Sequence, residues 1–271
     1  MAAALRIFSY LPNPRIWKAT IAARLCGIEV EVRGAAPGEL AQWLWDFDAR
    51  PLAEVAPEGL ATLERAGRVG FSRRSRLYKT DAFLDAHPFG TVPAAFSPDG
   101  RTGIFESNSI MRAVARLGQE RFALYGRDAY EASRIDSFLD ASLVFARDSQ
   151  LYLLALRGAV TSELHARMRE SFEAYLIGIE RALAPDRRFL VGDGISLADI
   201  CFVAELCLFH NERARQEALA AAGLKLLLDD DFARTYPRAA GHFQRLVAHP
   251  AVAPDAAGYL EKIERSSARS G

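Results

Sequence analysis

Cysteine is scarce in this sequence, and neither sign of charge is in excess. Three cysteines, Cys26, Cys201 and Cys207, form no CxxC pair and no even-numbered disulfide framework, and each lies in an apolar helical context. This distribution is typical of buried thiols in a reducing compartment. Because 34 Lys and Arg residues balance 34 Asp and Glu residues, the overall charge favours neither nucleic acid nor an anionic membrane as a partner. We therefore expect a small-molecule partner.

Long apolar runs are also lacking. No run approaches the roughly 20 residues that span a membrane, and the start of the chain has no charged region followed by a long apolar stretch, as a signal peptide would have. We therefore expect a cytoplasmic protein that contacts neither membrane nor nucleic acid. With 271 residues, half of them apolar, the chain is long enough for two domains of about 100 to 150 residues each.

Several catalytic motifs are missing as well. The five histidines are scattered, with no HExxH and no pairing with cysteine at metal-ligand spacing, and there is no glycine-rich phosphate loop and no GxSxG elbow. Metal, nucleotide and serine-hydrolase chemistry are therefore not expected. His210, beside Asn211 and Glu212, is expected to be a satisfied surface group and not a ligand.

The first residues predict a strand, a helix and a second parallel strand. Leu5–Ser9 is apolar enough for a buried strand, Arg15–Leu25 has a helical apolar pattern that Gly27 ends, and Ile28–Arg33 is again strand-like. A strand, helix and strand in so short a span imply a right-handed βαβ unit. This unit is the expected opening of a thioredoxin-like domain.

A segment at about 35–79 is longer than the loop and short helix expected after such a unit, so we interpret it as an insertion. Its first part, Glu39–Phe47, contains Trp43, Trp45 and Phe47 and is expected to pack as a helix. Its second part is basic, and a solvated face is the expected role of this part. The basic residues are Arg65, Arg68, Arg73, Arg74, Arg76 and Lys79.

The end of this half has the most informative pattern. A short helix, Thr80–His87, ends before Pro88 and is followed by Val92-Pro93 and by two short strands around a turn, Ala94–Ser97 and Thr102–Phe105. The helix Ser107–Leu117 then begins directly after Glu106.

The start of that last helix predicts an amino-acid receptor. A helix N-terminus presents unpaired N–H groups and a positive dipole end, so Ser107 beside Glu106 can bind an α-carboxylate and an α-amine together. The alternative is an ordinary helix cap at Ser107 or Ser109, worth about 1 kcal/mol over alanine. The binding interpretation is favoured because the Val-Pro pair, the hairpin and the Glu-Ser pair occur together and in this order.

This segment resembles the glutathione-binding half of the glutathione transferase superfamily. The resemblance implies that Val92-Pro93 carries a cis peptide bond, that Glu106 and Ser107 hold the γ-glutamyl end of glutathione, and that the protein is a homodimer. It also implies a thioredoxin-like α/β domain at 1–118 that contains the insertion, followed by an all-α domain at 127–265 on the side of a hydrophobic cosubstrate.

The second half is predicted to be helical. Its clearest helical stretches are Tyr130–Leu156, Glu163–Ala184 and Ser196–Asn211. Ser196 and Asp199 form a predicted capping box, and the same feature marks a buried helix of the superfamily. We assign these two residues a structural role. Aromatic residues in the first of these helices indicate a region for an apolar cosubstrate, although at helical spacing most of them are expected to be core.

The thiol of glutathione would lie near Ser9–Arg15, between the first strand and the first helix. A thiol with a pKa of about 8.5 needs hydrogen-bond donors or a helix N-terminus to become a thiolate. Pro14 at the first helical position makes Asn13 the natural N-cap, and Asn13 can donate from its amide, although it cannot act as a base. Ser9 and Tyr10 are the other candidates. The alternative is that Asn13 is only a cap.

Two resemblances at this helix favour different functions. Pro12-Asn13 is similar to the thiol site of the bacterial Nu-type transferases, whereas the pattern that includes Tyr10, Asn13 and Lys18 is similar to the transferase-like domain of the elongation factor complex gamma subunit. The first predicts a transferase that attacks an apolar or aromatic electrophile, and the second predicts a non-catalytic binding module. The enzyme is expected, because no large further domain follows the helical half of this sequence.

Overall fold

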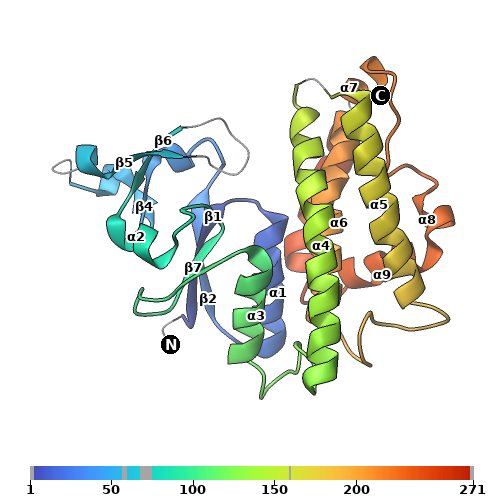
Figure 1. The fold of residues 1–271 in the computed structure, drawn as a ribbon, viewed down its shortest axis with the longest axis horizontal. Helices are drawn as coiled ribbons and strands as arrows, with labels where there is room; N and C mark the ends of the chain where they lie inside the picture. Colours follow the sequence, from blue (N-terminus) through green and yellow to red (C-terminus); the bar gives the residue numbers. More distant parts are fainter. Residues whose placement is uncertain (1–2, 57–59, 68–74, 159, 269–271) are drawn as a thin grey trace. The chain divides into compact units, whose positions relative to one another are not determined.

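The chain folds into two compact units, Met1–Phe122 and Ala123–Gly271 (Figure 1). The computed structural model describes residues 3–56, 60–67, 75–158 and 160–268. Among these residues no helix is long and apolar enough to cross a membrane. The three cysteines are buried free thiols, as their apolar contexts predict.

The first unit is built on a four-stranded sheet in the order β2-β1-β7-β8. The β1–β2 pair is parallel and the other two pairs are antiparallel. Helices α1 and α3 pack against each other (Figure 1). The strands are β1 (Leu5–Tyr10), β2 (Val30–Ala35), β7 (Ala94–Phe96) and β8 (Gly103–Phe105), and the helices are α1 (Pro14–Cys26), α2 (Asp81–Ala86) and α3 (Ser107–Leu117).

Helix α1 shows why this half is predictable from sequence. The Asn13 side chain accepts from the Arg15 N–H at 3.0 Å, and Pro14 is the first helical residue, where its missing N–H costs nothing. Gly27 closes the helix at φ 62°, a left-handed conformation that glycine adopts without steric cost. The predicted cap and stop are both confirmed.

The insertion forms a second sheet in the order β4-β3-β6-β5, and the helix expected over Glu39–Phe47 is wrong. A short 3₁₀ turn at η1 leads directly into β3, where the buried Trp45 donates from its indole N–H to the Leu40 carbonyl at 3.0 Å. Trp43, Trp45 and Phe47 are two residues apart, the period of a strand and not of a helix, so the spacing agrees with the strand that forms. The elements are η1 (Leu40–Gln42), β3 (Trp43–Trp45), β4 (Arg50–Pro51), η2 (Leu52–Glu54), η3 (Leu60–Leu63), β5 (Glu64–Gly67) and β6 (Ser75–Lys79).

The two sheets share one apolar core. Phe8 from β1 and Phe96 from β7 lie in the same buried cluster as Leu40, Trp45 and Leu77 from the insertion. Phe8 and Trp45 meet edge to face, with ring centroids 5.4 Å apart. The insertion is therefore an integral part of the unit, and its removal would expose the Phe8 side of the first sheet.

The basic part of the insertion is only partly the solvated face expected. Arg65 pairs with Asp81 at 3.0 Å and Arg76 pairs with Glu64 at 3.0 Å, all with exposed or partly exposed side chains. Arg68, Arg73 and Arg74 lie outside the described residues. Lys79 departs from the expectation, because only 5% of it is exposed.

The second unit is helical, with α6 buried along almost its whole length. Helix α6 packs against α4 and α9, and α4 also packs against α5. Phe145 and Tyr152 of α4 are buried, as expected for core residues at helical spacing. The elements are α4 (Ala129–Ala155), α5 (Ser162–Ala182), α6 (Leu197–Phe209), η4 (His210–Arg215), α7 (Gln216–Ala221), α8 (Phe232–Thr235), α9 (Pro237–Val247) and α10 (Ala253–Ala268).

His210, expected to be a satisfied surface group, is partly exposed, and the neighbouring Glu212 is buried. Burial lowers the pKa of His210 to about 4, and its Nδ1 lies 2.8 Å from the Leu206 carbonyl. Glu212 is fully buried, where it accepts from the Tyr152 hydroxyl at 2.7 Å and from the Leu228 N–H at 2.9 Å. Burial also raises the pKa of Glu212. Through these contacts His210 and Glu212 fix the segment that follows α6 to α6, α4 and the residues around Leu228.

The predicted capping box at the start of α6 is confirmed and extends further than the sequence shows. Asp199 Oδ2 accepts from both the Ser196 N–H and the Ser196 hydroxyl at 2.8 Å, and Oδ1 accepts from the Leu190 N–H at 3.0 Å. His242 of α9 lies 2.8 Å from the same Oδ1. One fully buried carboxylate thus joins α6, the preceding turn and α9.

Asp199→Ala should therefore lower the free energy of unfolding by about 3 to 5 kcal/mol, because it leaves several buried donors without an acceptor. Asp193→Ala, six residues away with a side chain that is 92% exposed, should change it by less than about 0.5 kcal/mol. Urea denaturation of the two variants measures the difference, and equal midpoints would contradict the structural role of Asp199.

Candidate functional site

Strand register brings the predicted site residues to one end of the first sheet. Phe8 of β1 is paired with Ala94 of β7, and Ala94 is paired with Phe105 of β8. The residues adjoining these three positions at that end are Ser9, Pro93 and Glu106. The loop into α1 and the start of α3 leave the sheet at the same end (Figure 1).

Val92 and Pro93 form the entry to β7. Their peptide bond is cis, as the resemblance implies. Val92 is 9% exposed, and its side chain belongs to the core cluster shared with the insertion. Burial of the Val92 side chain in this cluster therefore fixes the end of the loop that leads into β7.

Glu106 has an unusual backbone. Its φ of 66° and ψ of 124° make it the one residue other than glycine with a positive φ in the described part of the chain. Such conformations cost about 1 to 3 kcal/mol and persist at functional sites where the surroundings impose them. Here the Glu106 carbonyl accepts from the Ile110 N–H at 3.0 Å, so α3 starts while the carboxylate stays exposed.

Lys18 of α1 reaches the start of α3. Its Nζ donates to Asn108 Oδ1 at 2.8 Å and to Ser107 Oγ at 3.4 Å, and only 1% of the residue is exposed. The buried ammonium therefore fixes the side chains of the first two residues of α3. The role of Lys18 was not predicted, although its position between the apolar Trp17 and Ala19 is a signal of an inward-pointing charge.

Ser9 and Asn13, two of the candidates for the thiol, form a buried pair. Asn13 Nδ2 donates to Ser9 Oγ at 3.1 Å, while Asn13 Oδ1 accepts the Arg15 N–H as the cap of α1. Ser9 is 0% exposed and Asn13 is 1% exposed, so both lie beneath the surface. Tyr10, the third candidate, is partly exposed and packs on the core cluster.

The loop before Val92 is held by two buried bases. Lys79 Nζ donates to the Gly90 carbonyl at 2.5 Å and lies 4.7 Å from the centre of the Trp45 ring. His87 Nε2 lies 3.3 Å from the Thr91 N–H nitrogen, and its ring stacks on Phe105 with centroids 4.7 Å apart. Burial lowers the pKa of both bases. Through Lys79, the insertion supports the site loop directly.

No group of three or more His, Cys, Asp or Glu residues is placed to hold a metal ion within the ranges that the structure describes.

Comparison with known proteins agrees with this arrangement. A sequence model described as "Glutathione S-transferase, N-terminal domain" matches residues 14–117, from the start of α1 to the end of α3. The chain is 29% identical over 179 residues to probable elongation factor 1-gamma 1 of Arabidopsis thaliana, covering 64% of this chain and 38% of that protein. It is 29% identical over 130 residues to glutathione S-transferase F9 of the same plant, covering 45% of this chain and 60% of F9.

Solved structures extend the likeness to both units. The glutathione transferase URE2P8 from Phanerochaete chrysosporium, crystallised with oxidised glutathione, has a TM-score of 0.66 at 15% identity, covering 98% of this chain and 99% of the other. A glutathione S-transferase from Methylobacterium radiotolerans, in complex with glutathione sulfonate, has a TM-score of 0.59 at 18% identity, covering 93% and 94%. Residues 14–117 match the N-terminal domain of glutathione S-transferases, and the whole chain has the fold of solved glutathione transferases.

The superfamily fold predicted from sequence, a thioredoxin-like unit followed by a helical unit, is thereby confirmed, and the extra strands mark the insertion. The chain spans only part of its elongation-factor relatives: 38% of the Arabidopsis protein and 26% of elongation factor 1-gamma from Trypanosoma cruzi.

The positive φ of Glu106 gives a direct test of stored strain. Glu106→Gly should raise the free energy of unfolding by about 1 kcal/mol, because glycine adopts this conformation freely. Glu106→Ala removes the same carboxylate but keeps a Cβ, so it should give no such gain. Thermal or urea unfolding compares the two variants, and an equal effect of both would show that the backbone at Glu106 is unstrained.

Proposed function

We propose that this protein is a glutathione-dependent transferase that activates the thiol of glutathione for attack on an apolar or aromatic electrophile. The observation that carries the proposal is the start of α3, where a strained, exposed Glu106 adjoins a helix N-terminus. A carboxylate beside unpaired N–H groups offers one partner to an α-amine and several to an α-carboxylate. The γ-glutamyl end of glutathione carries both groups on one carbon.

The remaining contacts follow from the same sheet end. The backbone of Val92, next to Pro93, would pair with the cysteinyl part of glutathione, because it lies between the Glu106 site and the start of α1. The thiol would then lie near the N-terminus of α1, whose dipole favours a thiolate. Solved glutathione transferases with this fold, such as URE2P8, were crystallised with glutathione derivatives.

Asn13 is the proposed donor to the thiolate. Its Oδ1 is used by the helix cap and one Nδ2 hydrogen points to Ser9, which leaves the second Nδ2 hydrogen for the sulfur. Because both side chains are buried, this role requires the loop 11–13 to open slightly when glutathione binds. Tyr10, which is already partly exposed, is the competing donor.

The homodimer, the cytoplasmic location and the conjugation, ether-cleavage or dehalogenation chemistry belong to this proposal as parts of the superfamily resemblance. The electrophile would meet the helical unit, whose α4 carries the exposed apolar residues Leu143, Val144 and Leu151. These side chains suit an apolar compound.

A second function is favoured by the elongation factor 1-gamma relatives: a binding or scaffolding module that keeps the fold without turnover. A glutathione-affinity resin followed by a thiol-conjugation assay with several electrophiles separates the two. Retention on the resin with turnover supports the enzyme, whereas retention without turnover on any electrophile supports the module.

Ser107→Ala should weaken glutathione binding by about 1 to 3 kcal/mol, because a charged ligand group loses its hydroxyl partner. Glu106→Ala should have a similar effect. Ser109→Ala, two residues further along the same helix, is the matched control and should bind normally. Isothermal titration calorimetry measures all three, and unchanged affinity in both site variants would remove the γ-glutamyl site from this position.

Asn13→Ala should raise the pKa of the bound thiol and reduce turnover at neutral pH, with part of the loss recovered at higher pH. Alanine removes the amide donor and also the helix cap, so the free energy of unfolding should fall by about 1 kcal/mol. Absorbance of the thiolate as a function of pH gives the pKa, and calorimetry should show little change in affinity. Full turnover in this variant, together with loss of turnover in Ser9→Ala or Tyr10→Phe, would transfer the role to that hydroxyl.

A further inference from the structure

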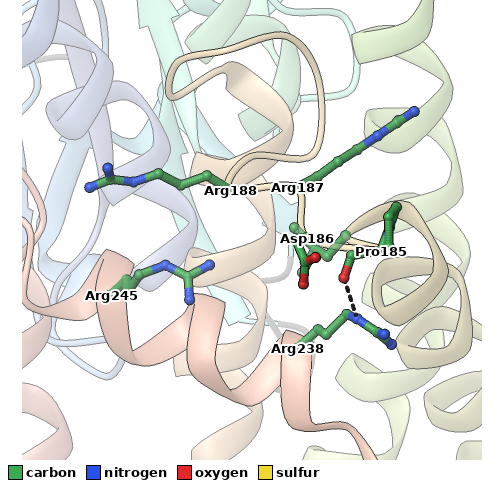
Figure 2. Close-up of a pocket in the computed structure, with 7 residues that line it drawn as sticks. Pro185, Asp186, Arg187, Arg188, Arg238 and Arg245 are labelled. Carbon is green, nitrogen blue, oxygen red and sulfur yellow. Dashed lines mark hydrogen bonds between the residues drawn. The ribbon is translucent and has the colours of Figure 1, made fainter.

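The second unit contains a pocket that the glutathione chemistry does not use. It has a volume of about 360 Å³ and lies where the turn after α5 meets α9 (Figure 2). Four of its seven lining residues are arginines, and one is acidic. The lining residues are Leu183, Pro185, Asp186, Arg187, Arg188, Arg238 and Arg245.

The positive charge of this pocket is only partly balanced, because Asp186 in the lining and Glu180 beside it offset two of the four arginines. Arg238 is paired with Glu180 at 3.3 Å. For Arg187, Arg188 and Arg245, no ion pair with a carboxylate is found among the residues that the structure describes. Like charges held together repel one another unless an anion lies between them, so the cluster favours a negatively charged ligand.

Two of the arginines, Arg238 and Arg245, are held in place by contacts with neighbouring residues. Arg238 donates from Nε to the Pro185 carbonyl at 3.2 Å, a bond drawn in Figure 2, in addition to its pair with Glu180. Arg245 lies with its NH2 nitrogen 3.3 Å from His242 Nδ1, and His242 is itself bound to the buried Asp199. These supports reduce the entropy that an arginine loses when it binds a ligand.

The arginines approach the pocket from separate elements. Arg188 and Arg187, neighbours in the turn, extend in opposite directions, and the Arg245 side chain, from α9, lies below Arg188 and points the other way from it (Figure 2). Guanidinium groups present paired N–H donors that match the oxygens of phosphate-type anions. Two such groups on separate elements suit an anion with more than one charged group.

We propose that this pocket binds a small anion with two linked phosphate groups, with Arg188 and Arg245 as its main ligands. The volume accommodates a diphosphate or a compact organic diphosphate and is too small for a macromolecule. Leu183 and Pro185 give the pocket an apolar side, which an organic body would contact. The site is independent of the proposed glutathione chemistry, because every residue in it belongs to the second unit.

The test is calorimetric titration of the full chain with inorganic pyrophosphate and with adenosine diphosphate, both without magnesium. We expect saturable binding of one anion per chain that weakens as sodium chloride is raised. Arg188→Gln and Arg245→Gln should each reduce the affinity about tenfold or more. Arg181→Gln, an exposed arginine in the last turn of α5 outside the pocket, is the matched control and should bind as the unaltered chain does.

Tighter binding of adenosine diphosphate than of pyrophosphate would assign the ligand to the organic diphosphates, and the reverse order would assign it to inorganic anions. The proposal is overturned if neither anion binds saturably at millimolar concentration, or if Arg181→Gln weakens binding as much as the pocket variants do. A melting temperature for each variant without ligand shows whether it is folded. If Arg245→Gln is unstable because His242 loses its neighbour, Arg188→Gln carries the test alone.

Discussion

The register of β1, β7 and β8 is the constraint on which the proposed site depends. Because Phe8, Ala94 and Phe105 lie side by side, the chain leaves the three strands at one edge, where two helices begin and one tight loop ends. A shift of one residue in any pair would turn buried side chains to the opposite face of the sheet. Apolar burial thus determines where polar chemistry can occur.

The boundaries of α1 could be predicted because their signals are local. Asn13, Pro14 and Gly27 mark helix boundaries through backbone geometry that neighbouring residues cannot change. The insertion shows the opposite case. Trp43 and Trp45 are two residues apart, which is the period of a strand and argues against the expected helix. The partner of that strand could not be predicted, because Trp45 is buried against Phe8, 37 residues earlier in the sequence.

The residues that support the proposed site were harder to predict from the sequence than the residues that line it. Glu106 and Ser107 stand in a recognisable pattern, whereas the buried ammonium groups of Lys18 and Lys79 act on positions far away in sequence. Charged residues are rarely fully buried unless they are paired, so sequence reasoning places a lysine at the surface by default. Their partners, Asn108 and the Gly90 carbonyl, become visible only when the chain is folded.

The starts of α6 and α3 each have an acidic residue beside the helix N-terminus, but the two residues have different roles. At α6 the buried Asp199 accepts from the Leu190 N–H and from the N–H and hydroxyl of Ser196, so its carboxylate is used within the protein and contributes stability. At α3 the preceding Glu106 has no side-chain bond to its own helix, and its backbone is held in a costly conformation. A fold maintains such an open, strained start only if neighbouring contacts compensate for it, and the buried bond from Lys18 to Asn108 does so here. The strain at Glu106 and the burial of Lys18 are therefore two parts of one arrangement at the start of α3, the position of the proposed γ-glutamyl site.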